Sequence, residues 1–323
     1  MSRKVAVGIA WRHVTSYNNI ARDICAVNEW DCQFVYPPFA PFSIAMPHPV
    51  DVFFGSVYDV VHSNAKARLY YITVEGELTE GYTDVRLKRV CSQSYCITVT
   101  KWGKEVFEKY GVPVADYIHH ALPIPVPAGE PRAERELDVV YQNDMYRLLS
   151  IPAGFVDRKG WDMWPRIVRE FPNSRGYTKS PYGYGLPNVA VYSSASIDEL
   201  YGRLESARVF ANLSLGEGFG MNVLMALAVG TNAVMFSHPV LNEVYGGIDG
   251  AHIVETAGEV DCRMPTDVLI KIKCVKPNID AYVAKVREVL NSWRTADWQT
   301  VRQKYDPYRL YKKFVEFLPV NNS

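Results

Sequence analysis

Residues 214–230 decide the fold of this chain, and they read SLGEGFGMNVLMALAVG. An apolar run over 209–213 precedes them, and Val223, Leu224 and Leu227 recur at the spacing of one buried helix face. The stretch therefore predicts a strand, a glycine-rich turn and a helix in succession. That succession places backbone N–H groups and the positive end of a helix at the carboxyl edge of a parallel sheet, which favours a phosphate ligand.

The residues of this turn suit different parts of a ligand. Gly218 and Gly220 permit close approach of the backbone to a phosphate. Glu217 suits sugar hydroxyls or a developing positive charge, because a carboxylate repels phosphate. Glycine spacing alone leaves an alternative, an ordinary turn between strand and helix with a solvated glutamate.

A second motif, Arg158-Lys159-Gly160, follows a strand expected at 148–153. Arginine offers a planar fork of donors and lysine a point charge, so the two together can clamp a diphosphate. The alternative for this motif is a solvated basic turn.

The rest of the chain alternates short apolar runs with amphipathic stretches, which is typical of an α/β protein. Before residue 123 we expect strands at 5–11, 32–36, 51–54, 69–74 and 95–99, with a helix at 101–110. After residue 132 we expect them at 137–141, 148–153, 189–192, 209–213, 233–236 and 252–254. Between these halves, residues 123–132 read PIPVPAGEPR and predict a linker.

The end of the chain predicts an amphipathic helix packed on a domain. Tyr311, Phe314, Val315 and Leu318 share one apolar face, and Pro307 interrupts the helical pattern before them.

Length and charge limit the classes of protein to which this chain can belong. A chain of 323 residues suits two domains. Its 35 Lys and Arg residues balance 35 Asp and Glu residues, which argues against a nucleic-acid partner. Because no apolar run approaches the roughly 20 residues of a membrane span, and residues 1–5 do not resemble a signal peptide, we expect a cytoplasmic protein. Any association with a membrane face would be peripheral.

The six cysteines fall into three local pairs: Cys25 with Cys32, Cys91 with Cys96, and Cys262 with Cys274. Without a C-x-x-C spacing we expect no zinc site. Free cytosolic thiols are the expectation, and local disulfides, as in intracellular proteins of hyperthermophiles, are the alternative.

Several motifs occur together in order: Arg158-Lys159-Gly160, then Asp198-Glu199-Leu200-Tyr201 before an apolar strand, then Ser214 and Glu217-Gly218-Phe219-Gly220 before a helix. In this order and spacing, residues 138–256 resemble the C-terminal half of a family 4 glycosyltransferase, a large retaining family of GT-B fold. The resemblance implies an α/β protein with two Rossmann-like, doubly wound domains facing across a cleft. The acceptor-side domain would span 1–128 and the nucleotide-sugar domain 129–304, with a helix at 305–323 crossing back toward the first.

The resemblance also implies roles for individual residues. Arg158 and Lys159 match ligands of the donor diphosphate, and Glu217 matches the glutamate that contacts the donor sugar. The backbone at Gly218, Phe219 and Gly220 would approach the sugar and phosphate.

The nucleoside side of the donor site matches less completely. Tyr192 and Ser193 match the segment that borders the nucleobase. Met225 stands where the family has a second glutamate that grips the ribose, and methionine accepts hydrogen bonds far more weakly. Either another group holds the ribose, or the donor binds weakly, or the protein is inactive.

In the N-terminal half the resemblance rests on strand order. Glu75 stands where the family often has a histidine near the sugar, so we expect a polar and catalytic role there. Thr100 is expected at the cleft edge or as a helix cap.

These observations predict a retaining glycosyltransferase with a UDP- or GDP-linked sugar donor. The acceptor would be a saccharide, a lipid-linked molecule or a protein. The family needs no metal and the sequence has no Asp-x-Asp triplet, so we expect no metal and no cofactor beyond the donor. The alternatives are a nucleotide-sugar epimerase on the same fold and a catalytically impaired binding or scaffold protein, the latter suggested by Met225 and Glu75.

Overall fold

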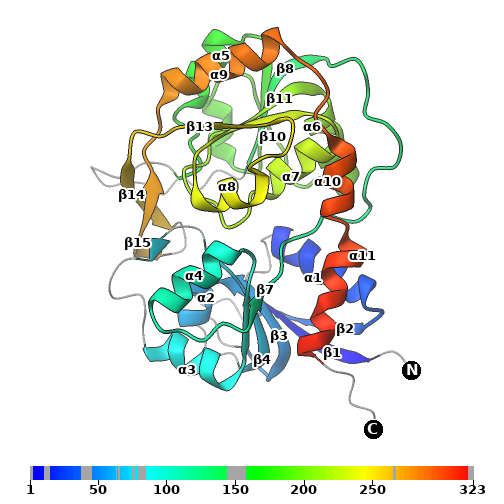
Figure 1. Ribbon diagram of the computed structural model, residues 1–323, viewed down its shortest axis with the longest axis vertical. Helices are drawn as coiled ribbons and strands as arrows, with labels where there is room; N and C mark the ends of the chain where they lie inside the picture. The colour runs from blue at the N-terminus through cyan, green and yellow to red at the C-terminus, as the bar shows by residue number, and fades with distance from the viewer. Residues whose placement is uncertain are drawn as a thin grey trace. The chain divides into compact units, whose positions relative to one another are not determined.

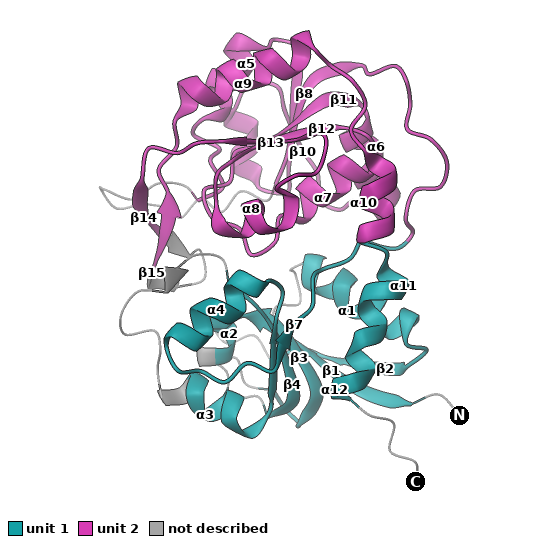
Figure 2. Ribbon diagram, viewed as in Figure 1, with its two compact units in different colours: residues 1–124, 305–323 teal, residues 125–304 magenta. Residues whose placement is uncertain are grey.

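In the computed structural model (Figure 1) the chain divides into two compact units. Unit 1 comprises Met1–Ile124 and Tyr305–Ser323, and unit 2 comprises Pro125–Lys304 (Figure 2). The sequence placed the first boundary slightly later, after residue 128. The structure describes residues 3–10, 15–37, 46–62, 64, 66–74, 77–78, 85–143, 158–264 and 267–318.

Unit 1 is built on a six-stranded parallel sheet in the order β2-β1-β3-β4-β6-β7. Its strands are β1 (Lys4–Ile9), β2 (Asp31–Val35), β3 (Val50–Ser56), β4 (Ala67–Thr73), β6 (Tyr95–Thr98) and β7 (Asp116–Tyr117), with a further short strand β5 (Glu77–Leu78). Its helices before the linker are α1 (Thr15–Val27), α2 (Val57–His62), α3 (Val85–Gln93) and α4 (Lys101–Lys109). Consecutive residues of β3 and β4 are buried, so both faces of the sheet are covered, as in other parallel sheets.

The end of the chain belongs to unit 1 and is not one continuous helix. It forms α11 (Pro307–Leu310), the 3₁₀ turn η2 (Tyr311–Lys313) and α12 (Phe314–Phe317). Tyr311, Phe314 and Leu318 are fully buried, as predicted, but Val315 is 36% exposed. The tighter 3₁₀ turn shifts the angular position of the following residues, so the predicted apolar face does not continue through Val315.

Unit 2 contains a second six-stranded parallel sheet, in the order β10-β9-β8-β11-β12-β13. The strands are β8 (Leu137–Gln142), β9 (Ser174–Thr178), β10 (Val189–Val191), β11 (Ala207–Asn212), β12 (Asn232–Phe236) and β13 (Ala251–Val254). Strand β9 was not predicted, and the strand expected at 148–153 lies outside the described residues. The chain runs outward from β8 to β10 and then returns beside β8 as β11. The strand order therefore reverses between β8 and β11, the kind of position where open α/β sheets bind ligands.

The helical elements of unit 2 are α5 (Trp164–Glu170), η1 (Pro181–Gly185), α6 (Ile197–Glu205), α7 (Met221–Ala228), α8 (Pro239–Tyr245), α9 (Ile279–Asn291) and α10 (Trp298–Lys304). Helix α6 begins with a capping box, in which Ser196 Oγ accepts from the Glu199 N–H and Glu199 Oε2 accepts from the Ser196 N–H. The Asp198–Tyr201 motif thus contributes a helix start.

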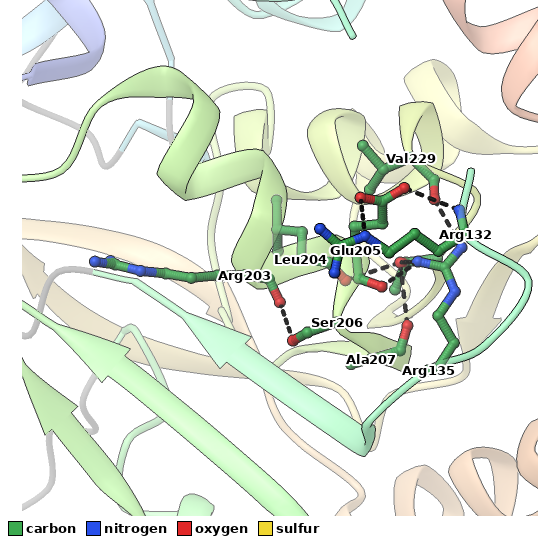
Figure 3. A network of polar contacts seen from close by, with 9 residues as sticks. Arg132, Arg135, Arg203, Leu204, Glu205, Ser206, Ala207 and Val229 are labelled. Carbon is green, nitrogen blue, oxygen red and sulfur yellow. Dashed lines mark hydrogen bonds and ion pairs between the residues drawn. The ribbon is translucent and has the colours of Figure 1, made fainter. Parts of the chain in front are cut away.

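Arg132, at the end of the Pro-rich linker, and Arg135, just after it, bind the ends of helices in unit 2 (Figure 3). Arg135 donates to the carbonyl oxygens of Glu205 and Val229, at the ends of α6 and α7. Arg132 forms an ion pair with Glu205, Nε to Oε2 at 3.3 Å. These carbonyls have no intrahelical partner, so the arginines satisfy helix ends while they fix where the linker joins the unit.

An antiparallel hairpin, β14 (Glu259–Met264) and β15 (Asp267–Val275), was not predicted. Its alternation of buried Cys262, Ile272 and Cys274 with polar residues is the period of a strand with one buried face, and would have indicated it. The Val275 N–H donates to the Leu215 carbonyl at 3.0 Å, so the base of the hairpin is bonded to the glycine-rich turn.

All six cysteines are disulfide-bonded, so the expectation of free thiols is wrong. Cys25 pairs with Cys32, Cys91 with Cys96, and Cys262 with Cys274. The Cα–Cα distances are 6.2, 5.3 and 5.8 Å, because each pair lies on two elements that are neighbours in the fold.

No helix among the described residues has the length and apolar character needed to cross a bilayer.

Candidate functional site

The two motifs that the sequence singled out meet in unit 2. Arg158 lies in the connection after β8, and Leu215 and Gly216 in the turn after β11. The Leu215 N–H donates to the Arg158 carbonyl at 2.8 Å, and Arg158 NH1 donates to the Gly216 carbonyl at 2.7 Å. Because β8 and β11 are neighbouring parallel strands, their following loops share the same edge of the sheet. The pairing therefore places the basic motif against the glycine-rich turn at the reversal of strand order.

Gly160 is required for this packing. Its φ is +66°, and a Cβ there would stand 2.2 Å from the Leu213 carbonyl oxygen. The Tyr141 hydroxyl, on β8, donates to the carbonyl of Lys159. The backbone of the basic motif is thus held between β8 and the turn after β11.

Lys159 and Glu217 form a buried ion pair at the site. Lys159 Nζ lies 2.9 Å from Glu217 Oε1, with the two side chains 10% and 13% exposed. Burial raises the pKa of Glu217, but the nearby charges of Lys159 and Arg158 outweigh it, and the net pKa lies below its ordinary value. Glu217 is therefore a carboxylate at neutral pH, with acceptor oxygens at the end of a strongly cationic loop.

His238 adds an uncharged group beside this ion pair. It caps α8, its Nδ1 accepting from the Val240 N–H at 3.3 Å. Burial lowers its pKa to about 4, Arg158 acts in the same direction, and Glu217 opposes both. The imidazole is consequently neutral at pH 7.

Helix α7 starts directly after the glycine-rich turn. Gly220 precedes it at φ +82°, and a Cβ there would lie 3.0 Å from the Leu241 side chain. The Tyr245 hydroxyl donates to the Gly220 carbonyl at 2.9 Å, and Phe219 packs edge-on against Tyr245. The Phe219 side chain is buried, so only backbone at this position is available to a ligand.

Asn222 and Met225 both lie on α7. Asn222 Nδ2 donates to the Gln142 carbonyl at 2.6 Å, which ties the first turn of the helix to the end of β8. Met225, three residues further on, is 3% exposed. Its side chain is packed within unit 2 as the structure stands.

Tyr192 and Ser193 lie farther along the sheet, after β10, two strands from β8. Tyr192 is held by its N–H bond to the Thr178 carbonyl at 3.0 Å and stacks with Arg203, whose guanidinium carbon lies 4.1 Å from the ring centroid. Arg203 is also 4.9 Å from the Tyr177 ring, so its guanidinium contacts two aromatic side chains. Ser193 is exposed. The structure thus brings Arg158, Lys159 and Glu217 together and leaves these two residues outside that cluster.

In unit 1, Thr100 is a helix cap, since its Oγ1 accepts from the Gly103 N–H at 3.1 Å. Glu75 lies outside the described residues, and its expected role stays a prediction. Among the residues that the structure describes, no group of three His, Cys, Asp or Glu side chains is placed to hold a metal ion.

No family model and no curated protein matches the sequence. Solved structures do match the fold. HepE from Anabaena, in complex with UDP and glucose, is 11% identical over 98% of this chain and 99% of its own, with a TM-score of 0.65. WaaG, a glycosyltransferase involved in lipopolysaccharide biosynthesis, is 11% identical over 98% and 100%, with a TM-score of 0.59. Sucrose-phosphate synthase from Thermosynechococcus elongatus is 12% identical over 97% and 94%, with a TM-score of 0.57.

Some of the other matches are longer proteins. TarM is 13% identical over 83% of this chain, with a TM-score of 0.51, and the match spans only about half (54%) of TarM. At such identities a likeness establishes fold and not activity. The chain has the α/β GT-B fold of these glycosyltransferases, with two Rossmann-like units, each on a six-stranded parallel sheet.

Proposed function

We propose that the protein is a glycosyltransferase that uses a nucleotide-diphosphate sugar as donor. The observation that carries the proposal is the pairing of two buried cations, Arg158 and Lys159, with the glycine-rich turn at the reversal of strand order in unit 2. Buried cations need an anionic partner, and a diphosphate supplies more negative charge than Glu217 alone. The neighbours solved in complex with UDP favour a UDP-linked donor over a GDP-linked one.

The proposed chemistry follows from where charge develops. As the bond between the sugar and the diphosphate breaks, negative charge grows on the leaving group. Arg158, Lys159 and the start of α7 would stabilise that charge by fixed electrostatic contacts. Glu217, held ionised by its neighbours, would accept hydrogen bonds from hydroxyls of the transferred sugar.

The finer features of the proposal rest on the sequence resemblance. They are membership of family 4, retention of anomeric configuration, independence of metal, a hexosyl donor, and a saccharide, lipid-linked or protein acceptor. A cytoplasmic location, also part of the proposal, requires a cell interior in which disulfides persist, because the six cysteines are paired.

A nucleotide panel tests the proposal. UDP, GDP, ADP and their sugar conjugates are added to the full chain, and the thermal midpoint is measured. We expect one nucleotide series to raise the midpoint and the matching sugar conjugate to be consumed in the presence of an acceptor. If every nucleotide leaves the midpoint unchanged, the proposal is wrong.

The same assays separate the two rivals. An epimerase would return an altered nucleotide sugar without any acceptor. A scaffold protein would bind the nucleotide but leave the sugar conjugate intact with every acceptor class.

A further inference from the structure

Two amide side chains lie at the reversal of strand order in unit 2. Gln142 is the last residue of β8 and Asn212 the last of β11, and each is 2% exposed. Val140 pairs with Phe210 in the register of these strands, so two residues further along Gln142 stands opposite Asn212. In-register residues of neighbouring parallel strands project from the same face of the sheet, which puts the two amides side by side.

Each amide has one atom without a hydrogen-bond partner. These atoms are Gln142 Oε1, an acceptor, and Asn212 Nδ2, a donor. A buried polar atom left unpaired costs about 1–3 kcal/mol, and most such atoms in folded proteins are paired. The two atoms therefore call for a partner that the described protein does not supply.

Two backbone groups at the end of β8 are hydrogen-bonded, which helps to fix the strand end. The Gln142 carbonyl accepts from Asn222 Nδ2, and the Asn143 N–H donates to the Tyr177 carbonyl at 3.2 Å. Since Asn222 belongs to the first turn of α7, the end of β8 is tied to the same helix start that faces the proposed diphosphate. The two unpaired amide atoms are thus preorganised at the foot of the candidate site.

We propose that Gln142 and Asn212 form a hydroxyl-binding pair in the donor site. One ligand hydroxyl would donate to Gln142 Oε1 and accept from Asn212 Nδ2. A hydroxyl fits because it both donates and accepts, whereas phosphate or carboxylate oxygens only accept and an ammonium only donates. The inference rests on the proposed function, since the donor carries the hydroxyls, either on its ribose or on the transferred sugar.

The pair would also supply what α7 lacks. Met225 lies one turn beyond Asn222 and offers no strong acceptor. Gln142, bonded to that first turn through Asn222, offers one from the neighbouring strand.

The test measures binding of the nucleotide sugar that stabilises the protein best, against analogues that each lack one hydroxyl. The analogues are the 2′-deoxyribose and 3′-deoxyribose forms and the deoxy forms of the sugar. We expect one of them to bind the unmodified protein about 10-fold more weakly than the full donor, since an unmet buried pair costs about a factor of ten in affinity. Whether that analogue is altered on the ribose or on the sugar identifies the source of the hydroxyl.

Two nearly isosteric variants, Gln142→Met and Asn212→Leu, are tested with the full donor and with the same deoxy analogues. We expect each to bind the full donor about 10-fold more weakly and to lose the discrimination against the deoxy analogue. Without ligand their thermal midpoints should be equal to or above the parent value, because an unpaired buried amide contributes nothing to folding. Asn232→Leu is the matched control: its amide Nδ2 is bonded to the Arg294 carbonyl at 2.7 Å, so its loss should lower the midpoint.

The outcomes are distinct. If the full donor binds but every deoxy analogue binds equally well, or the variants discriminate like the parent, the amides hold an ordered water only and the inference is wrong while the proposed function stands. If no nucleotide sugar binds, both are wrong. The analogue series on the unmodified protein decides the question even where a variant does not fold.

Discussion

Unit 1 and unit 2 share one architecture, six parallel strands whose order reverses once, but the described parts of their carboxyl edges differ. In unit 1 the polar side chains at strand ends satisfy one another. Ser56, ending β3, donates through Oγ to Asp59 Oδ2 at 2.9 Å, and Thr73, ending β4, lies 3.2 Å from the Tyr17 hydroxyl. In unit 2 the same edge carries a buried ion pair and two unpaired amides. In the described residues, the same fold thus carries hydrogen-bonded polar side chains at two strand ends of unit 1 and amide atoms without a partner at two strand ends of unit 2.

The largest expected effect comes from removing the buried ion pair of unit 2, and it is an effect on the rate of catalysis. Lys159→Ala should lower sugar transfer about 100- to 1,000-fold, the usual cost of removing one preorganised group that stabilises a leaving charge. Steady-state rates with the identified donor measure it. Lys273→Ala is the matched control, since it breaks a partly exposed Lys–Asp pair of 2.6 Å in the hairpin of the same unit. A near-parental rate for Lys159→Ala would refute the diphosphate role.

Acid should lower the stability of the two units to different extents. In unit 2 the pKa of His238 is lowered from 6.5 to about 4, so the unfolded state takes up a proton that the native state does not between these values. The free energy of unfolding of unit 2 should fall by about 3 kcal/mol as pH drops from 6.5 to 4, at about 1.4 kcal/mol per pKa unit. Hydrogen exchange of unit 2 peptides measures it.

In unit 1 the pKa values of two buried groups are shifted in opposite directions, and their effects on the free energy of unfolding nearly cancel. Burial lowers the pKa of His120 to about 3, which costs stability as pH falls below 6.5. Burial raises the pKa of Asp23 from 3.8 to about 7, so the native state takes up a proton first and stability rises as pH falls from 7 toward 3.8. Unit 1 should therefore keep nearly the same free energy of unfolding at pH 4.5 as at pH 7, and Asp23→Asn should remove that resistance. A larger loss of hydrogen-exchange protection in unit 1 than in unit 2 on acidification, after correction for the intrinsic exchange rate at each pH, would contradict this account.

Removal of one disulfide from each unit should have a smaller effect, and it also compares the two units. Removing Cys25–Cys32 from unit 1 or Cys262–Cys274 from unit 2 by double serine substitution should cost about 2–3 kcal/mol each, given loops of 7 and 12 residues. Only the second should also weaken donor binding, because Val275 at the base of that hairpin bonds Leu215 in the glycine-rich turn. Denaturant unfolding and nucleotide titration measure the two effects. Equal donor affinity in both double variants would show that the hairpin does not support the turn.

The smallest effect concerns helix caps, one in each unit. Thr100→Ala and Ser196→Ala should each lower the free energy of unfolding by about 1 kcal/mol, the ordinary value of a capping hydroxyl. Ser196→Ala should cost slightly more, because its capping box loses a reciprocal partner in Glu199. Urea unfolding checks both values, and an unchanged midpoint for either would mean that water replaces that cap.

The sequence predicted the parts of the fold that local patterns encode. The strand before residue 214 and the helix after Gly220 follow from apolar spacing, and both were confirmed as β11 and α7. Strand β9 was missed because Ser174, Arg175 and Gly176 carry no apolar alternation. The three cysteine pairs were identified from the sequence, but their oxidation was not expected, because sequence separation shows which cysteines can meet and not whether they are oxidised.

The candidate site was predicted in part for a similar reason. The chemical types of Arg158, Lys159 and Glu217 in glycine-rich turns mark them in the sequence. Gln142 and Asn212 carry no such mark. Their significance depends on a register between strands 70 positions apart and on the absence of partners, and both are properties of the assembled sheet.

Unit 1 is formed by two segments that are far apart in the sequence, and this has a consequence for biosynthesis. The ribosome delivers residues 3–124 first, but the amide of Ala121 and the side chain of Asn28 bond to Tyr311, which is made after all of unit 2. Pro125–Lys304 is continuous and receives its last residue while the nascent N-terminal sheet still lacks Tyr311, Phe314 and Leu318. The later part of the chain can therefore mature before the earlier one, so an elongation arrest before residue 311 leaves unit 1 with an open apolar surface for chaperones to cover.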